Sequence, residues 1–494
     1  MSVSAVTPLT ILHTSDWHLG RRLYGRLRYD EFAAFLNWLQ DTISAQQVDI
    51  LVVAGDIFDT MTPSNKAQAL YYEFLGKVSK SCCQHVVIVA GNHDSPTFLS
   101  APCNVFKFLN VHVVGTACDD LNDEVMVLDD AAGIPHCIIA AVPYLRDRDV
   151  SSSSAGESAQ SKDANVIKGI CAHYDEVAHI AKVKQAELGK AHQRHIPIIA
   201  TGHLFAAGGT TTDDDGVREL YVGSLGKVSA DMFSKSFDYV ALGHLHVPQR
   251  VGGRETIRYS GSPIAMGFGE ACQQKQILLI QFGAVLNNTG LTVENLSKSI
   301  SQKLTNTTVN ADKAIEKTAK KSVNQAASFI DDLFADVESI ESDPHNETRS
   351  EQFSEESEVI LSTPFTLTTT LLHHDTSRQM QVTSLPIPTF QKLAQVSGDL
   401  ETINQTVDNT IKTLTDTESV WLEIVYTGDE VVSELRESIE AMVEGLPCEV
   451  LKIKNTCTYN KVLNQQQISE TLQDLNEQEV FERCLATLKY FLFI

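Results

Sequence analysis

Residues 49–59 read DILVVAGDIFD, a run of apolar residues that ends on a glycine and two carboxylates. A short continuous apolar run rich in valine and isoleucine predicts a strand that is buried on both faces of a sheet. Loops at the carboxyl ends of such strands are where open α/β sheets place their ligand sites. We therefore expect Asp56 to lie at the edge of a sheet, ready to bind a ligand.

Four other segments repeat this arrangement of an apolar, strand-like run followed by polar side chains. They are Asp16 and His18 after residues 10–13, Asn92 after residues 86–89, His203 after residues 196–199, and His244 and His246 after residues 239–242. A single segment of this kind is as readily a structural turn as a site. Five of them, four with a glycine beside the ligand, favour one shared metal site over coincidence.

The seven candidate ligands are aspartate, asparagine and histidine without any cysteine, a set that suits Mn²⁺, Mg²⁺, iron or Zn²⁺. Two ions about 3.5–4 Å apart need a bridging carboxylate, and together they activate water and neutralise charge on a phosphoryl group. Asp56 is the expected bridge because its loop is central in the set.

The motifs themselves resemble those of calcineurin-like metallophosphoesterases: Asp-x-His, Gly-Asp-x-x-Asp, Gly-Asn-His-Asp, Gly-His and Gly-His-x-His. The surrounding sequence narrows the resemblance to the SbcD family, the nuclease subunits of bacterial SbcCD complexes. The similar stretches are residues 15–20, 55–60, 142–149 and 258–263. The likeness covers residues 8 to about 285 and about 384 to 487.

This resemblance implies a layered α-β-β-α sandwich with a small α+β capping domain and a C-terminal helical segment that binds an ATPase partner. It implies two divalent ions, with Mn²⁺ expected. The residues that match the family place the first ion on Asp16, His18, Asp56 and His246, and the second on Asp56, Asn92, His203 and His244. His93 matches a residue that acts on the chemistry without being a permanent ligand. Asp59 and Asp94 are candidates for holding the ligands or their loops in position.

The activity implied by the resemblance is ATP-dependent 3′ to 5′ exonuclease action on double-stranded DNA, with hairpin and single-strand endonuclease action, in DNA repair, replication and recombination. The implied partners are DNA and an SbcC-like SMC-type ATPase, in a heteromeric complex that can contain a dimer of each protein. An alternative is a phosphatase or small-molecule phosphodiesterase of the same superfamily, which would share every metal ligand. A scaffold that kept only the fold would be expected to lose ligands, and none is lost here.

Composition sets limits on these hypotheses. The 494 residues are 43% hydrophobic and 21% charged, the longest apolar runs are too short for a membrane helix, and residues 1–10 do not resemble a signal peptide. Ten cysteines without a C-x-x-C pair read as reduced thiols, so we expect a cytoplasmic protein without a membrane anchor.

A net charge of −24 is unusual for a protein that binds nucleic acid, but the charge is unevenly distributed. Residues 331–358 hold eleven acidic residues and one arginine, a net charge of −10. In contrast, four arginines follow the first candidate metal loop, namely Arg21, Arg22, Arg26 and Arg28. Their position makes them candidates for DNA contact, although such a cluster is also typical of a solvated helix approach.

These landmarks predict four parts of the chain. Residues 1–290 form the metallophosphoesterase nuclease domain, with helices expected over residues 31–44 and 66–79 and about 164–188, and a strand over residues 276–282. Residues 291–362 are an acidic low-complexity insert for which we expect disorder. Residues 363–456 form the capping domain, and residues 457–494 are the helical segment expected to contact the ATPase.

Overall fold

The computed structural model describes residues 8–151, 158–206, 228–283, 369–372, 380–415, 417–428 and 434–456, together with Gly209 and Val432. The chain separates into two compact units, one formed by Met1–Ala284 with Thr368–Ile494 and the other by Val285–Leu367. The expected disordered insert at 291–362 and the expected partner-binding segment at 457–494 lie outside the described residues.

Two sheets carry the candidate ligands. The first has the strand order β14-β15-β13-β1-β4-β5-β6 in the described part of the chain. Its strands are β1 (Leu9–Thr14), β4 (Ile50–Ala54), β5 (His85–Val89), β6 (Val111–Val114), β13 (Gln276–Phe282), β14 (Thr369–Leu372) and β15 (Met380–Pro386). Strands β1, β4, β5 and β6 run parallel, so their carboxyl ends meet at one edge.

The second sheet has the strand order β11-β12-β10-β9-β8-β7. Its strands are β7 (Val125–Asp129), β8 (Pro135–Ala140), β9 (Ile198–His203), β10 (Tyr239–Gly243), β11 (Gln249–Val251) and β12 (Arg254–Tyr259). Strands β9 and β10 are parallel, so His203 and the loop after Gly243 lie at the same end.

The inner faces of the two sheets share one apolar core. Ile11, Val52 and Leu278 of the first sheet pack in the same buried cluster as Ile139 and Ala241 of the second. The apolar runs of the sequence are thus buried on both faces, as continuous runs of valine and isoleucine predict.

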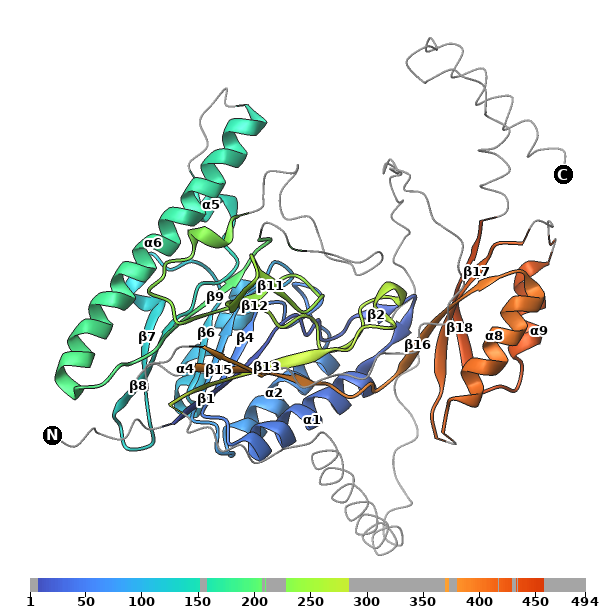
Figure 1. Ribbon diagram of the computed structural model, residues 1–494, viewed down its shortest axis with the longest axis horizontal. Helices are drawn as coiled ribbons and strands as arrows, with labels where there is room; N and C mark the ends of the chain where they lie inside the picture. The colour runs from blue at the N-terminus through green and yellow to red at the C-terminus, as the bar shows by residue number, and fades with distance from the viewer. Residues whose placement is uncertain are drawn as a thin grey trace, which may run out of the picture. The chain divides into compact units, whose positions relative to one another are not determined.

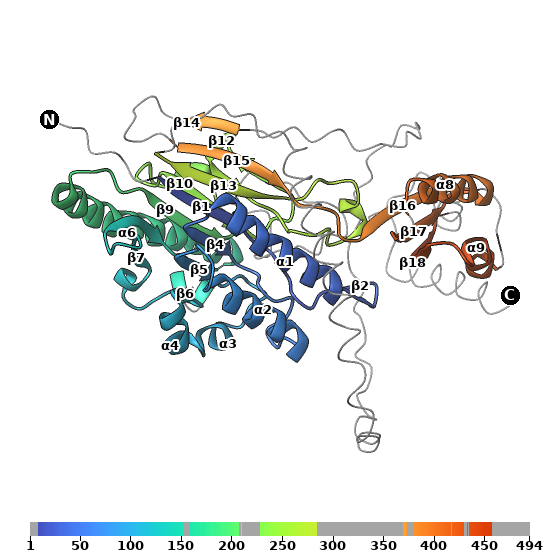
Figure 2. The same cartoon turned by 90° about the horizontal axis from the view of Figure 1, so that it is seen from below.

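Helices cover the outer faces, which completes the α-β-β-α layering (Figures 1 and 2). Helices α1 (Tyr29–Gln46) and α2 (Asn65–Val78) lie along the first sheet in Figure 2, with α3 (Pro96–Ser100) and α4 (Cys103–Phe106) near β6. Helix α6 (Ala159–His192) covers the second sheet, and the short α5 (Asp147–Val150) precedes it.

The helical spacing of apolar residues explains these contacts. Phe32, Phe35, Leu36, Leu39 and Ile43 of α1 are all buried, a spacing that gives one apolar stripe along a helix. Helices α1 and α2 start at Tyr29 and Asn65, within two residues of the predicted positions 31 and 66. The helix expected at about 164–188 is longer at both ends.

A third sheet, β16-β17-β18, forms the small α+β part of the chain. It consists of β16 (Lys392–Gly398), β17 (Val420–Tyr426) and β18 (Cys448–Asn455), all parallel, with α8 (Leu400–Lys412) and α9 (Leu435–Val443). Val396, Leu422 and Ile424 of the sheet bury Ile403 and Ile439 of the two helices.

The expected start of the capping domain at residue 363 is too early. β15 pairs with β13 over seven residues and β14 pairs with β15, so both strands extend the first sheet of the sandwich. The third sheet begins only at Lys392. The sequence pattern did not reveal that β15 belongs to the first sheet, because its partner strand β13 lies about one hundred residues earlier in the chain, before the insert.

Candidate metal centre

The loops with candidate ligands are tied to one another by hydrogen bonds. The Asp16 and His18 amides donate to the carbonyls of Gly55 and Asp56, at 3.0 and 2.9 Å. Across the two sheets, the His244 amide donates to Asp16 Oδ1 at 2.8 Å. These hydrogen bonds therefore hold the loops that follow β1, β4 and β10 in fixed positions relative to one another.

Three of the ligands expected for the first ion converge. Asp16, His18 and His246 each offer a ligand atom within 4.8 Å of the others, and all three are buried. The two imidazoles point toward each other, with 3.1 Å between His18 Nε2 and His246 Nε2. One of these nitrogens can donate to the other, and both can bind one cation once that proton is lost.

The ligands expected for the second ion lie beside them. His203 Nε2 is 2.9 Å from Asn92 Oδ1, and His203 Nδ1 donates to the Ala54 carbonyl at 3.0 Å. That bond to a carbonyl fixes the proton on Nδ1 and directs Nε2 into the site. The ring of His244 lies 5.3 Å from that of His203, and its buried Nε2 has no hydrogen-bond partner in the part of the chain that the structure describes.

Asp56 lies between the two groups. Its Oδ2 is 3.5 Å from His18 Nε2 and 3.3 Å from His203 Nε2, so one carboxylate oxygen faces a ligand of each expected ion. Asp56 Oδ1 accepts the His93 amide at 2.9 Å, which fixes the orientation of the carboxylate.

Burial and charge prepare these groups for a cation. Burial raises the pKa of the Asp16 carboxyl to about 6 and lowers the pKa of His244 to about 3. Burial opposes charge on His203 as well, but the adjacent Asp56 carboxylate outweighs it and raises the pKa of His203 to about 9. The Asp56 carboxylate thus favours positive charge at this position, as expected for a cation site.

The donor set fits two divalent ions. Every candidate ligand is buried except Asn92, which is partly exposed, and His244 offers an imidazole nitrogen that no described residue binds. Carboxylate, amide and imidazole donors without thiolate suit borderline-hard cations. The sequence-predicted ligands are therefore all brought together.

The backbone is strained where the ligands sit. Asp16, His18, Asp56 and His244 have positive φ angles of 53°, 47°, 51° and 101°. This conformation costs about 1–3 kcal/mol for each residue that is not glycine, and it persists where the surroundings enforce it. Four such residues in one cluster indicate a site whose geometry was selected for ligand binding.

The glycines beside the ligands allow the loops to approach closely. A methyl group on Gly91 would overlap Asp56 Oδ1 and the Asp56 amide, and one on Gly243 would overlap the Ala54 carbonyl. These close approaches explain the glycine that precedes a ligand in four of the five segments.

Gly91→Ala tests this packing. Because the added methyl must displace Asp56, we expect the variant to lose about 1–3 kcal/mol of stability and part of its bound metal. Gly76→Ala is the matched control, since a methyl there meets nothing within 4 Å. Thermal melting and metal analysis of both variants give the answer, and equal metal content with equal melting temperatures would contradict the explanation.

Asp59, Asp94 and His93 surround the ligands. The Asp94 carboxylate accepts the amides of Ile57, Phe58 and Gly91, so it holds the Asp56 loop against the Asn92 loop. Asp59 Oδ1 lies 3.4 Å from His18 Nδ1, and the Asp59 carbonyl accepts His93 Nδ1 at 2.8 Å.

The four arginines separate into different roles. Arg28 is buried, with both Glu31 oxygens and the Ala265 carbonyl as acceptors, so it is not available for DNA contact and that expectation is wrong. Sequence could not reveal this burial, because Arg28 directly precedes α1 in a run of exposed residues. Arg21 pairs with Asp59 at 3.4 Å, close to the ligands, while Arg22 is exposed.

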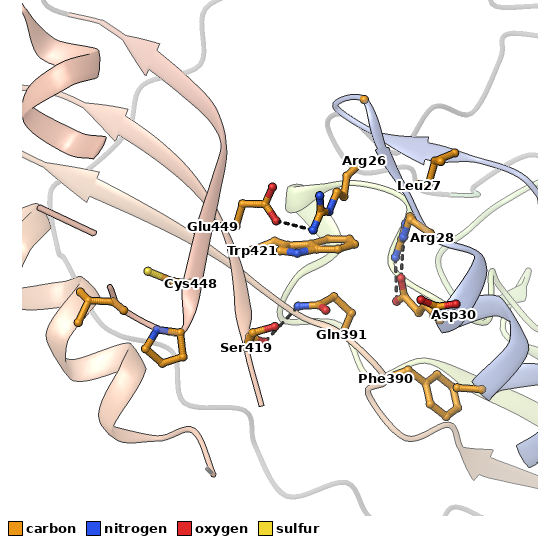
Figure 3. A pocket seen from close by; sticks show the side chains of 15 residues that line it. Arg26, Leu27, Arg28, Asp30, Phe390, Gln391, Ser419, Trp421, Cys448 and Glu449 are labelled. Carbon is orange, nitrogen blue, oxygen red and sulfur yellow. Dashed lines mark hydrogen bonds and ion pairs between the residues drawn. The ribbon is translucent and has the colours of Figure 1, made fainter. Parts of the chain in front are cut away.

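Arg26 faces the third sheet across a groove of about 780 Å³ (Figure 3). It pairs with Glu449 at 3.1 Å and lies over the ring of Trp421. The groove walls also include Asp30 and Glu31 and none of the candidate ligands. Its mixed charge makes it a poor place for a phosphate backbone.

Two residues that support the Asp16 loop were not among the candidates from the sequence. Ser15 donates to Asp16 Oδ2 at 2.6 Å and lies 2.8 Å from the Ser260 hydroxyl. Trp17 is buried behind the loop, where its ring donates to Thr14 Oγ1 and packs on Phe74. Ser15 directly precedes the candidate ligand Asp16 in the sequence, and this position could have identified it as a supporting residue.

Comparison with known proteins agrees with this geometry. Residues 9–248 match the family model described as calcineurin-like phosphoesterase, and residues 389–488 match the one described as type 5 capsule protein repressor C-terminal domain. The chain is 30% identical to the D subunit of nuclease SbcCD from Escherichia coli strain K12 over 97% of its own length and 93% of the relative's. The chain belongs to the SbcD family.

Two further members of the family align with about half of the chain. The SbcD protein of Rhodobacter capsulatus is 36% identical over 53% of this chain and 64% of its own length. That of Bacillus subtilis is 34% identical over 55% of this chain and 66% of its own. The chain is accordingly a metal-dependent hydrolase of the nuclease type, with the α/β fold of calcineurin-like phosphoesterases and a C-terminal SbcD domain. Among the described residues, no helix combines the length and apolarity needed to cross a bilayer.

Proposed function

We propose that this SbcD family member hydrolyses DNA phosphodiester bonds with two divalent ions, Mn²⁺ foremost, as the nuclease component of an SbcCD-like complex. The position of Asp56 carries the proposal, because its Oδ2 lies within 3.5 Å of one imidazole from each expected ligand set. Asp16, His18, Asp56 and His246 would hold the first ion, and Asp56, Asn92, His203 and His244 the second.

The bound ions would supply an activated water and positive charge next to the scissile phosphate. The chain's own residues would hold the ligands of these ions in position. Hydrogen bonds between the loops hold the ligands in a fixed arrangement, so little reorganisation is needed during the reaction. Asp94 holds the Asp56 loop through three amides, which keeps the bridging carboxylate in place.

His93 is the proposed general acid. Its Nδ1 donates to the Asp59 carbonyl, which leaves Nε2 as the ring nitrogen that can accept a proton. Its ring lies 4.7 Å from that of the candidate ligand His18, measured between centroids. In this position His93 Nε2 protonates the leaving oxygen or orients the phosphate.

Arg21 and Arg22 are the proposed DNA contacts next to the metals. Arg21 is linked to the site through Asp59, and its amide also donates to the His18 carbonyl at 3.0 Å. Arg22 follows it on β2 (Arg22–Leu23) and is exposed. Guanidinium groups bind phosphate oxygens in pairs, which suits a DNA backbone that passes the ligand loops.

Arg22→Gln should weaken DNA binding in a sequence-independent way. The loss of one phosphate contact lowers the slope of log K against log salt by about 1. Fluorescence anisotropy with a DNA hairpin over a salt series measures it, in a His93→Ala background that suppresses cleavage. Lys182→Gln on the exposed face of α6 is the charge-matched control. If both variants show the same slope as the parent, Arg22 does not contact DNA.

The names of the relatives describe them as the SbcD component of the nuclease SbcCD. We extend this to a heteromeric complex with an SbcC-like SMC-type ATPase in the cytoplasm, which can contain a dimer of each protein and acts in DNA repair, replication and recombination. Its proposed activities are ATP-dependent 3′ to 5′ exonuclease cleavage of double strands and endonuclease cleavage of hairpins and single strands. The partner would use residues 457–494, which lie outside the described residues.

A nuclease assay tests the proposed function. Purified protein is incubated with Mn²⁺ and either linear DNA, a DNA hairpin or a phosphomonoester such as para-nitrophenyl phosphate. The proposal expects cleavage of both DNAs that depends on Mn²⁺. Turnover of the phosphomonoester alone would instead support a phosphatase of the same superfamily.

A further inference from the structure

A buried ion pair lies directly behind the candidate ligand His246. Glu270 belongs to the short helix η4 (Phe268–Glu270), and its side chain is fully buried. Lys275 Nζ donates to Glu270 Oε2 at 2.5 Å, and the Lys275 side chain is only 7% exposed. A buried ion pair of this kind adds little stability compared with apolar residues of the same size, so its presence invites another explanation.

Lys275 is bound to the main chain of His246. Its Nζ donates to the His246 carbonyl at 3.2 Å and to Ser262 Oγ at 3.1 Å. The Ser262 amide donates to the same carbonyl at 3.1 Å. Two donors therefore hold the backbone of one candidate ligand.

Glu270 faces the ring of the same histidine. Its Oε2 accepts Lys275 and the Met266 amide, while Oε1 is buried with no hydrogen-bond partner among the described residues and lies 3.9 Å from His246 Nδ1. The other ring nitrogen, His246 Nε2, faces His18 and hence the candidate metal position. A buried carboxylate oxygen without a donor is costly, and His246 Nδ1 is a donor that faces it at 3.9 Å.

We propose that Glu270 is a positioning residue for His246: it accepts the Nδ1 proton and so keeps the lone pair of Nε2 directed at the first ion. Lys275 neutralises the carboxylate and anchors the carbonyl of the same ligand. Carboxylates behind metal-binding histidines act in this way in many metal sites. The inference rests on the proposed ligand set of the first ion.

Glu270→Gln separates positioning from simple structural support. The amide oxygen of glutamine can still accept Lys275 and the Met266 amide, so its NH₂ group is turned toward His246 Nδ1. That group donates, which favours the tautomer with the proton on Nε2, and this tautomer does not bind a metal ion. The variant should lose about 10–100-fold in affinity for one Mn²⁺ while the affinity for the other stays the same.

Isothermal titration of the metal-free protein with Mn²⁺ measures the two affinities, and a melt of the metal-free form reports on folding. Glu255→Gln is the matched control, because it alters a largely buried ion pair with Arg258 that touches no candidate ligand. Unchanged affinities in Glu270→Gln, or equal weakening of both ions with a lower melting temperature, would overturn the proposal.

The tautomer of His246 can also be measured in the wild-type protein. In the Mg²⁺-loaded form, the ¹⁵N shifts of His246 should report a proton on Nδ1, and a proton on Nε2 would overturn the proposal. The titration of the wild type also distinguishes two failures. Fewer than two Mn²⁺ per chain would refute the proposed metal centre, whereas two ions with normal binding in Glu270→Gln would refute only the role of Glu270.

Discussion

Asp56→Asn is expected to abolish DNA hydrolysis and to empty both metal positions. The asparagine keeps the size of the side chain and can still accept the His93 amide through its oxygen, so the loop should remain folded. However, it replaces the charged Oδ2, which faces His18 and His203, with a neutral amide. Because the other ligands each serve one ion, replacing any one of them is expected to weaken the binding of one ion only.

Metal analysis by mass spectrometry, together with the nuclease assay, checks this expectation. Asp49→Asn is the control, since Asp49 precedes the same strand β4 at its other end and binds the Thr10 amide far from the ligands. It should retain both ions and full activity. If Asp56→Asn keeps its normal content of both ions, Asp56 is not the bridge.

His93→Ala should leave two ions bound and still lower the cleavage rate by about 10² or more, the usual contribution of a positioned acid or base. The reason is that His93 lies against His18 but is held by the Asp59 carbonyl, and its absence removes no expected ligand. Single-turnover cleavage at saturating Mn²⁺ separates this loss from weaker metal binding.

His85→Ala provides the comparison for this second change. His85 starts the strand β5 that leads to His93 and contacts His112 and the Asp129 carbonyl at the opposite end. It should cleave at the normal rate. A His93→Ala protein that is as fast as His85→Ala would remove His93 from the mechanism.

Local sequence pattern predicted the parts of the fold that depend on local physics. The strand over residues 276–282 coincides with β13, because alternating and continuous apolar runs reflect burial in a sheet directly. The ligand loops were found for the same reason, since each follows such a run. A glycine in four of them marked the close approach that the structure explains at Gly91 and Gly243.

The parts that were missed depend on contacts between distant segments. Nothing near Met380 indicates that β15 returns to the first sheet, because its partner β13 precedes the insert. Arg28 resembles its exposed neighbours in sequence, yet Glu31 and the Ala265 carbonyl bind it in the interior. Glu270 lies 24 residues after His246 and in no recognisable motif, and only the structure brings its carboxylate behind that imidazole.

Anomalous diffraction from a crystal of the protein grown with Mn²⁺, recorded at the manganese absorption edge, can locate the bound ions directly. We expect two anomalous peaks about 3.5–4 Å apart, with the Asp56 carboxylate between them. The first should lie against Asp16, His18 and His246, and the second against Asn92, His203 and His244. A single peak, or two peaks that do not share Asp56, would contradict a two-metal centre bridged by this residue.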